Sequence, residues 1–183
     1  MSQMNSLKEL LRHDVQQLLS CEEQIIAALP AMVAKAGNPA LKQALEEHLR
    51  VTERQRDRIN EVRRILGATE ESVTDHQGFL TRLMGAGDKC KGVEGIIEEG
   101  VKVMAEDLSP EVMDAAIIGG CQKIEHYEIA CYGTARTYAE QLGLTEVAQL
   151  LQQTLLEEQD ADDRLSALAM ADVNLRAEAG GVQ

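Results

Sequence analysis

The sequence predicts an all-α fold, a bundle of four long helices arranged as two antiparallel hairpins. Composition is the first observation: the 183 residues include no Trp, one Phe, three Tyr and three Pro, a balance that favours helices over sheets. The second observation is a set of long stretches whose apolar residues recur every three or four positions. The third is an internal repeat, which relates the first half of the chain to the second.

The length of the chain fits one domain, which we expect to cover residues 1–176. It should contain a hairpin over 6–66, a crossover over 67–109 and a second hairpin over 110–172, followed by a flexible tail over 177–183. The 31 acidic and 18 basic residues give a net charge of −13. This charge argues against nucleic-acid binding and would favour the uptake of cations. No apolar run approaches the length needed to span a bilayer, so we expect no membrane association.

The four cysteines show no metal-binding or redox spacing. Cys21, Cys90, Cys121 and Cys131 form no CxxC pair and no zinc-finger pattern. Because the N-terminus shows no signal peptide, we expect a cytoplasmic protein whose thiols are reduced. We interpret all four as small buried hydrophobic groups.

The first hairpin begins with a helix predicted over 6–36, in which Pro30 should cause a kink or bulge without ending the helix. Its inward stripe combines apolar residues with one carboxylate: Leu7, Leu11, Val15, Leu18, Glu22, Ile25, Leu29 and Met32. The break at Gly37-Asn38-Pro39 supplies a C-terminal cap, an N-cap and a first helical residue, in that order. The second helix should then run over 39–66 and end at Gly67.

The crossover differs from the hairpins because glycines interrupt it. They break up any long helix and leave room for a short one over 93–105: Gly78, Gly85, Gly87, Gly92, Gly95 and Gly100. Ser109-Pro110-Glu111 is a helix start signal, an N-cap followed by Pro and an acid. We predict the third long helix from there to Leu142, with Gly143 ending it, and the last helix over 145–170.

The internal repeat relates positions 106 residues apart. It places Glu22 on Glu128, Gly37 on Gly143, and Asp57-Arg58-Ile59 on Asp163-Arg164-Leu165. The repeat therefore predicts two similar helical hairpins joined by one long crossover, which is the ferritin-like arrangement of a four-helix bundle.

Carboxylates interrupt the apolar stripes at one level of this bundle. In the third long helix Glu125 lies on the inward face and Glu128 lies about one turn away. When each hairpin is folded at its glycine, Glu22, Glu125, Glu128 and Glu158 come to one level. Clustered carboxylates with imidazoles are typical ligands of iron or manganese, two ions at a time. The predicted metal ligands are Glu22, His48, Glu125, Glu128, Glu158 and Asp162, with Glu157 and Glu53 in reserve.

Each of these residues also has an ordinary structural interpretation. Glu158 belongs to an acidic run over 157–163, and such runs are usually solvated surface. His48 taken alone is more often a packing residue, His126 should lie beside the site or on the surface, and Tyr132 is more often core. The symmetric pair of Glu22 and Glu128 favours a metal, because a buried carboxylate without a compensating charge costs several kcal/mol.

Several segments resemble the YciE/YciF family of ferritin-like proteins, over about residues 7–170. They are Ser20-Cys-Glu22-Glu-Gln-Ile, Leu29-Pro30, Glu46-Glu-His48-Leu, Val93-Glu94-Gly-Ile-Ile-Glu98-Glu99, Ile124-Glu125-His126-Tyr127-Glu128-Ile-Ala-Cys-Tyr132-Gly-Thr and Leu150-Leu-Gln-Gln-Thr154-Leu. The Glu-His-Tyr-Glu block is the most specific of them. The resemblance implies a bundle of the rubrerythrin and ferritin kind, a homodimer and an association with bacterial stress responses. It supplies no established reaction.

The chain departs from this family between His48 and Thr52. The family typically carries acidic residues there, whereas this chain has Arg50 and Val51. If that position normally supplies a ligand, the metal site is asymmetric, mononuclear or empty.

Three functions remain open at this point. The first is a di-iron or di-manganese carboxylate protein that reacts with dioxygen or peroxide. The second is a non-catalytic stress or structural protein whose metal is absent or only structural. The third is iron storage, which would need a cage of many subunits.

Overall fold

The structure is a computed structural model that describes residues 4–68 and 89–180, and every element in this part of the chain is a helix. The elements are α1 (Leu7–Lys35), α2 (Pro39–Ala68), α4 (Lys91–Met104), α5 (Pro110–Gln141), α6 (Thr145–Leu168), a π-helical turn η1 (Ala169–Val173) and α7 (Asn174–Gly180). The predicted all-α fold is confirmed. The glycine-rich part of the crossover, with Gly78, Gly85 and Gly87, lies outside the described residues.

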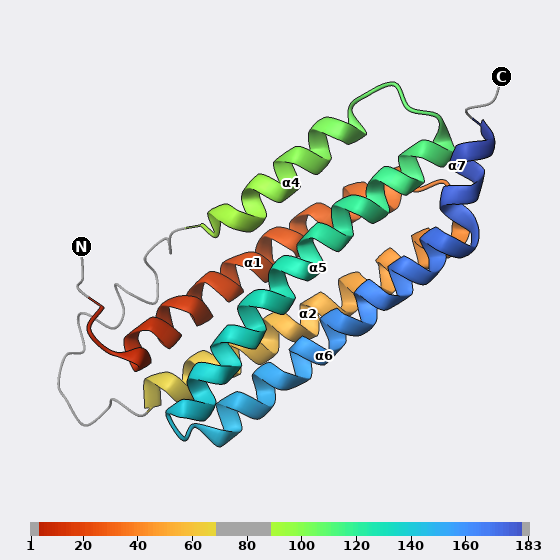
Figure 1. Cartoon of the computed structure of the whole chain (residues 1–183). Helices are drawn as coiled ribbons and strands as arrows, with labels where there is room; N and C mark the ends of the chain where they lie inside the picture. The colour runs from red at the N-terminus through yellow and green to blue at the C-terminus, as the bar shows by residue number, and fades with distance from the viewer. Residues whose placement is uncertain (1–3, 69–88, 181–183) are drawn as a thin grey trace.

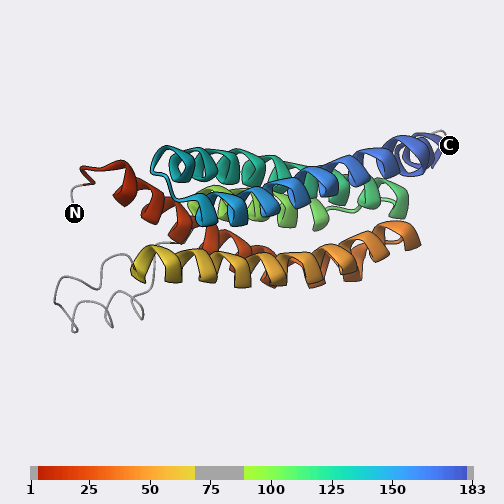
Figure 2. The ribbon, with the colours of Figure 1, turned by 90° about the horizontal axis from the view of Figure 1, so that it is seen from below.

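The four long helices form a bundle of two antiparallel hairpins (Figure 1). α1 packs against α2 and α5, and α6 packs against the same two helices. The short helix α4, which belongs to the crossover, lies against α1 and α5. Figure 2 shows the hairpin of α1 and α2 on one side of the bundle and the hairpin of α5 and α6 on the other. This is the predicted ferritin-like arrangement.

The turn between α1 and α2 is held by a residue from α5. The backbone amides of Gly37 and Asn38 donate hydrogen bonds to the two carboxylate oxygens of Asp114, at 2.7 and 2.8 Å. Asn38 is the N-cap of α2, as predicted, because its side-chain oxygen accepts from the amide of Ala40 at 2.9 Å. The predicted cap at Gly37 is wrong. α1 ends at Ala36 in an extended conformation, and among the described residues only Gly143 has a positive φ.

Most other helix ends follow the sequence signals, but α2 continues through Gly67, its predicted end, to Ala68. α1 continues through Pro30, Ser109 caps α5, and Gly143, with φ of 70°, follows the end of α5. The flexible tail expected over 177–183 stays a prediction, since α7 continues to Gly180 and residues 181–183 lie outside the described part of the chain. The predicted domain boundary at residue 176 therefore falls inside a helix.

A polar layer divides the apolar core into two clusters. We use this name for Glu22, His48, Thr52, Gln55, Glu125, Glu128 and Glu158. One apolar cluster includes Leu18, Ile59 and Leu151, and the other includes Ile25, Leu45, and Leu165. Each long helix thus contributes apolar residues to both clusters and polar residues between them. None of the described helices is long and apolar enough to cross a membrane.

Candidate metal centre

Four carboxylates lie in the interior of the bundle at the level of the polar layer. Glu22 comes from α1, Glu125 and Glu128 from α5, and Glu158 from α6, and each is at most 1% exposed. His48 of α2 lies beside them, with its Nε2 atom 3.3 Å from Oε1 of Glu125. The structure therefore brings together five of the six residues that the sequence singled out as ligands.

Each of the four carboxylates has one oxygen without a hydrogen-bond partner among the described residues. These atoms are Glu22 Oε2, Glu125 Oε2, Glu128 Oε1 and Glu158 Oε2. Buried polar groups are nearly always paired, and an unpaired buried carboxylate is among the most costly exceptions. A positive charge close to these unpaired oxygens would therefore stabilise the folded protein.

Two of the remaining carboxylate oxygens receive hydrogen bonds from neutral donors. Tyr132 donates its hydroxyl hydrogen to Oε1 of Glu22, and the amide of Gln55 donates to Oε1 of Glu158. Such donors orient the carboxylates without neutralising them. Arg58 lies near enough to lower the pKa of Glu22, but its guanidinium is bound to Glu157 at 2.8 and 2.9 Å.

Burial and mutual repulsion raise the pKa values of three of the acids. For Glu128 burial is the main cause, followed by the charges of Glu22, Glu158 and Glu125. Burial and the charge of Glu158 also raise the pKa of Glu22, although the hydrogen bond from Tyr132 lowers it. Burial and a hydrogen bond with Glu158 raise the pKa of Glu125. Without a cation, the layer can hold its acids together only by retaining protons.

His48 is in the form that a metal ligand requires. Burial lowers the pKa of its imidazole, although the charge of Glu158 acts in the opposite direction. A neutral imidazole carries a free lone pair for a metal ion. His48, Glu125 and Glu158 each offer one ligand atom, and these three atoms lie within 4.8 Å of one another. A set of several carboxylates and one imidazole fits iron or manganese.

The layer departs from the symmetrical di-metal pattern, in which two helices carry one Glu each and two others carry Glu-x-x-His. α2 has Thr52 and Gln55 at the Glu-x-x-His spacing, and α6 has Glu158 and Ala161. The hydroxyl of Thr52 donates a hydrogen bond to the backbone oxygen of His48, at 2.9 Å. The acids thus come from three helices, and α2 supplies an imidazole instead.

Three residues considered from the sequence lie outside this cluster. Asp162 is on the inward stripe of α6, but it accepts a hydrogen bond from Gln122 at 3.0 Å and contacts His126 at 3.3 Å. Its side chain is 17% exposed, so Asp162 is not one of the buried carboxylates, and its role as a metal ligand stays a prediction. Of the two reserves, Glu157 is paired with Arg58 and Glu53 is exposed.

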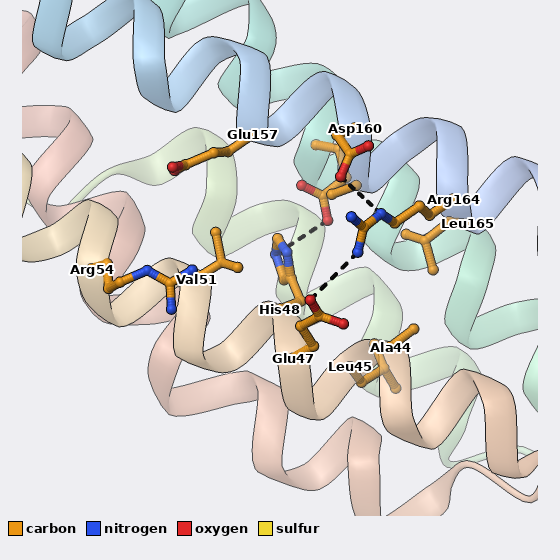
Figure 3. A pocket seen from close by; sticks show the side chains of 12 residues that line it. Ala44, Leu45, Glu47, His48, Val51, Arg54, Glu157, Asp160, Arg164 and Leu165 are labelled. Carbon is orange, nitrogen blue, oxygen red and sulfur yellow. Dashed lines mark ion pairs between the residues drawn. The ribbon is translucent and has the colours of Figure 1, made fainter.

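A cavity of about 260 Å³ opens beside the layer, between α2 and α6 (Figure 3). His48 and Glu125 line its inner part, and Val51 lies at its wall. Arg164 bridges its sides by ion pairs to Glu47 at 3.5 Å and Asp160 at 2.8 Å. Val51 therefore places an apolar side chain at this cavity, in the segment where the family resemblance led us to expect an acid.

Sequence reasoning did not assign a role to Tyr132 or Gln55. From the sequence alone, Tyr132 is interpreted only as a residue that is more often core. The available signal was polarity, because a buried hydroxyl or amide usually has a partner. The identity of that partner depends on packing between helices, which the spacing within one helix does not define.

Comparison with known proteins agrees with this architecture. Residues 6–178 match the family model described as a domain of unknown function, DUF892. The chain belongs to this family. It is 38% identical over 175 residues to Protein YciF of Escherichia coli K12, which covers 96% of this chain and 97% of that protein. The resemblance to the YciE/YciF proteins is thereby confirmed.

Solved structures of relatives have the same fold. The E. coli stress protein YciF matches with a TM-score of 0.78 and 38% identity, over 93% of this chain and 99% of that one. YcfI of Rhodopseudomonas palustris, a candidate structural protein, matches with a TM-score of 0.74 and 32% identity, over 88% and 94%. A protein of Xanthomonas campestris, 21% identical with a TM-score of 0.68, supports the fold alone.

Proposed function

We propose that this YciF-type protein binds two ions of iron or manganese in the polar layer and uses them in peroxide or dioxygen chemistry during bacterial stress. One observation carries the proposal: four carboxylates are buried in the bundle, and each has an oxygen without a partner among the described residues. Bound cations would satisfy these oxygens and offset the repulsion among the acids.

The contacts within the layer suggest how the ligands divide. His48, Glu125 and Glu158 would hold one ion, since their ligand atoms already lie within 4.8 Å of one another. Glu22 and Glu128 would hold the other, because the charge of Glu22 raises the pKa of Glu128 and the charge of Glu158 raises the pKa of both. Glu158 acts on both Glu22 and Glu125, which makes it the best candidate for a shared ligand.

The chain's own residues would prepare this site for redox chemistry. Iron or manganese, when bound, supplies changes of oxidation state. Tyr132 would fix the orientation of Glu22, and the neutral imidazole of His48 would present its lone pair next to the cavity. The buried acids would release the protons that they retain without a metal. The apolar clusters on both sides of the layer would exclude bulk water.

Elemental analysis of purified protein tests the proposal. After loading with iron or manganese we expect about two ions per chain, and less than half of that in Glu128→Gln. Glu23→Gln is the matched control, because Glu23 follows Glu22 directly but is exposed; it should bind metal as the unmodified protein does. A chain that takes up neither metal, or a Glu128→Gln variant that binds normally, contradicts the proposed site.

A non-catalytic structural or stress protein is the second candidate. It is favoured by the apolar Val51 at the cavity and by the lack of an acid in the inward positions of α2 at Thr52 and Gln55. The relative from R. palustris, a candidate structural protein, points the same way. Peroxide consumption separates the two functions. A rate that depends on metal and is lost in Glu128→Gln excludes the structural role, and metal-loaded protein without any rate supports it.

The assembly and the compartment remain proposals. We expect a homodimer in the bacterial cytoplasm, as the resemblance implies, without nucleic-acid or membrane partners. Light scattering after size-exclusion chromatography should give about twice the chain mass of 20.1 kDa. A cage of many subunits would instead favour iron storage.

A further inference from the structure

The beginning of α4 is fixed to α1 on both sides of Cys21. The backbone amide of Cys90, the N-cap of α4, donates to the hydroxyl of Ser20 at 3.0 Å. The backbone oxygen of Cys90 accepts from the side-chain amide of Gln24 at 3.2 Å. Since Ser20 and Gln24 flank Cys21 within about one helical turn, Cys90 is held over this turn, and each of the two thiols shifts the pKa of the other.

Cys90 lies in surroundings that favour its thiolate. Its sulfur is 3.2 Å from the hydroxyl of Tyr127. The Tyr127 ring packs on Gly92 so closely that a Cβ there would lie 2.5 Å from it. The pKa of Cys90 is lowered to about 5, and the neighbouring Cys21 thiol is the main cause. The hydroxyl of Tyr127 and the backbone amides of Val93 and Gly92 also lower this pKa, whereas burial raises it. Thiolates at helix N-termini are typical nucleophiles.

The other cysteines lack this combination. Cys121 contacts Met32, with 3.8 Å between the two sulfur atoms, and burial raises the pKa of its thiol to about 12. Cys131 is partly exposed, and burial raises its pKa in spite of the hydrogen bond with Tyr127. Of the four cysteines, only Cys90 combines a lowered pKa with a backbone that is fixed over the helical turn of a second cysteine.

We propose that Cys90 and Cys21 form a redox-active pair that reduces a small hydroperoxide and closes to a disulfide between α4 and α1. The Cys90 thiolate attacks one oxygen of hydrogen peroxide, so that an S–O bond forms, the O–O bond breaks, and the leaving hydroxide takes up a proton to become water. The Cys21 thiol then attacks the sulfur of the Cys90 sulfenic acid, and the S–S bond forms as a second water leaves. Two thiols are oxidised and one hydroperoxide is reduced, without a metal.

The burial of the pair defines its substrate and its products. Cys21 and Cys90 are 1% and 2% exposed, which disfavours bulky hydroperoxides and disulfides with other chains, so hydrogen peroxide is the expected substrate. A small dithiol would return the pair to its reduced form. The reaction is independent of the metal proposed above, so each can fail without the other.

The test treats full-length protein, stripped of metal with a chelator, with hydrogen peroxide and then blocks the remaining thiols by alkylation. Free thiols should fall from four per chain to two, and peptide mass spectrometry should find Cys21 linked to Cys90. Dithiothreitol should reverse the link. Cys121→Ser is the matched control and should still form it. Four remaining thiols, or a link that joins Cys131 to Cys90, would overturn the proposal.

Two further variants keep the proposal testable should one of them fold poorly. Cys21→Ser should stop at the sulfenic acid of Cys90, which dimedone traps, and Cys90→Ser should leave Cys21 reduced. The same link should form in Glu128→Gln, where metal binding is expected to be lost. A link that needs bound metal contradicts the proposal but leaves the function of the polar layer intact.

Discussion

Tyr132 shows how a single side chain serves both the core and the polar layer. Its ring belongs to the apolar cluster that contains Leu18 and Leu151, while its hydroxyl donates to Glu22. Burial, followed by the charges of Glu22 and Glu128, raises the pKa of this tyrosine, so the hydroxyl keeps its proton. A permanent donor therefore fixes one oxygen of Glu22 and leaves the other free for a cation.

Replacing Tyr132 by Phe should weaken metal binding while the fold is retained. The change removes the donor to Glu22, whose pKa should rise further, and partners of this kind contribute about 10- to 100-fold to metal affinity. Isothermal titration of metal-free protein with Mn²⁺ measures the effect. Tyr138→Phe on the same helix is the control, because Tyr138 is only partly buried and lies outside the layer. Equal affinities in the two variants would contradict the role of Tyr132.

At the residue scale, helical periodicity predicted which residues are buried better than it predicted their partners. It correctly placed Glu22, Glu125 and Glu158 in the interior, because burial depends on the face of one helix. It did not predict the partners of Asp162, one turn beyond Glu158, whose carboxylate contacts Gln122 and His126. The direction of a side chain depends on neighbouring helices, which the stripe does not contain.

At the scale of elements, the turn over 36–38 depends on a carboxylate from another helix. Asp114 is 6% exposed, and its two oxygens bind the amides of Gly37 and Asn38. The sequence predicted a turn held by glycine conformation, which is a local device. The observed hydrogen bonds instead join residues that are 76 and 77 positions apart in the sequence, and no local pattern predicts a contact of that range.

Replacing Asp114 by Ala should therefore destabilise the bundle. Two amides lose a charged acceptor, and hydrogen bonds to charged groups contribute roughly 1.5–3 kcal/mol each. We expect the free energy of unfolding to fall by about 3 kcal/mol, measured by urea denaturation followed by circular dichroism. Asp107→Ala, at an exposed position nearby in the chain, should change it by less than about 0.5 kcal/mol. Similar losses in both variants would show that Asp114 does not hold the turn.

At the scale of the whole molecule, the polar layer couples stability to pH. The pKa values of Glu22, Glu125 and Glu128 are raised in the folded state, so above the ordinary carboxylate pKa of about 4.3 the folded protein holds more protons than the unfolded chain. Their contribution to stability is complete below that pH and is lost as pH rises through the folded pKa values. Metal ions replace these protons and should remove the effect.

Metal-free protein should therefore melt at a lower temperature as the pH rises from about 6.5 to 8. The measurement is best made in Cys90→Ser, because the lowered pKa of Cys90 gives the opposite slope. Differential scanning calorimetry should show a weaker slope in Glu128→Gln and none after metal loading. A melting temperature that rises with pH in metal-free Cys90→Ser would mean that the acids are ionised in the folded state without a cation.

The sequence predicted the arrangement of the whole molecule well, because the repeat of 106 residues and the apolar stripes both describe packing of entire helices. The two hairpins and the short crossover helix follow from them. The end of the molecule was less predictable. α7 follows a π-helical turn, and Val173 within that turn is buried against the bundle, a tertiary contact that keeps the chain helical beyond residue 176.

The two sides of the polar layer differ, since α4 lies across α1 and α5 while the cavity opens between α2 and α6. Molecules would thus have a route to the layer through this cavity, past Val51 and Ala161. The width of this route would discriminate among oxidants, admitting hydrogen peroxide and rejecting the hydroperoxides of long-chain lipids. Evolution could then adjust the speed and selectivity of the centre through wall residues that never touch an ion.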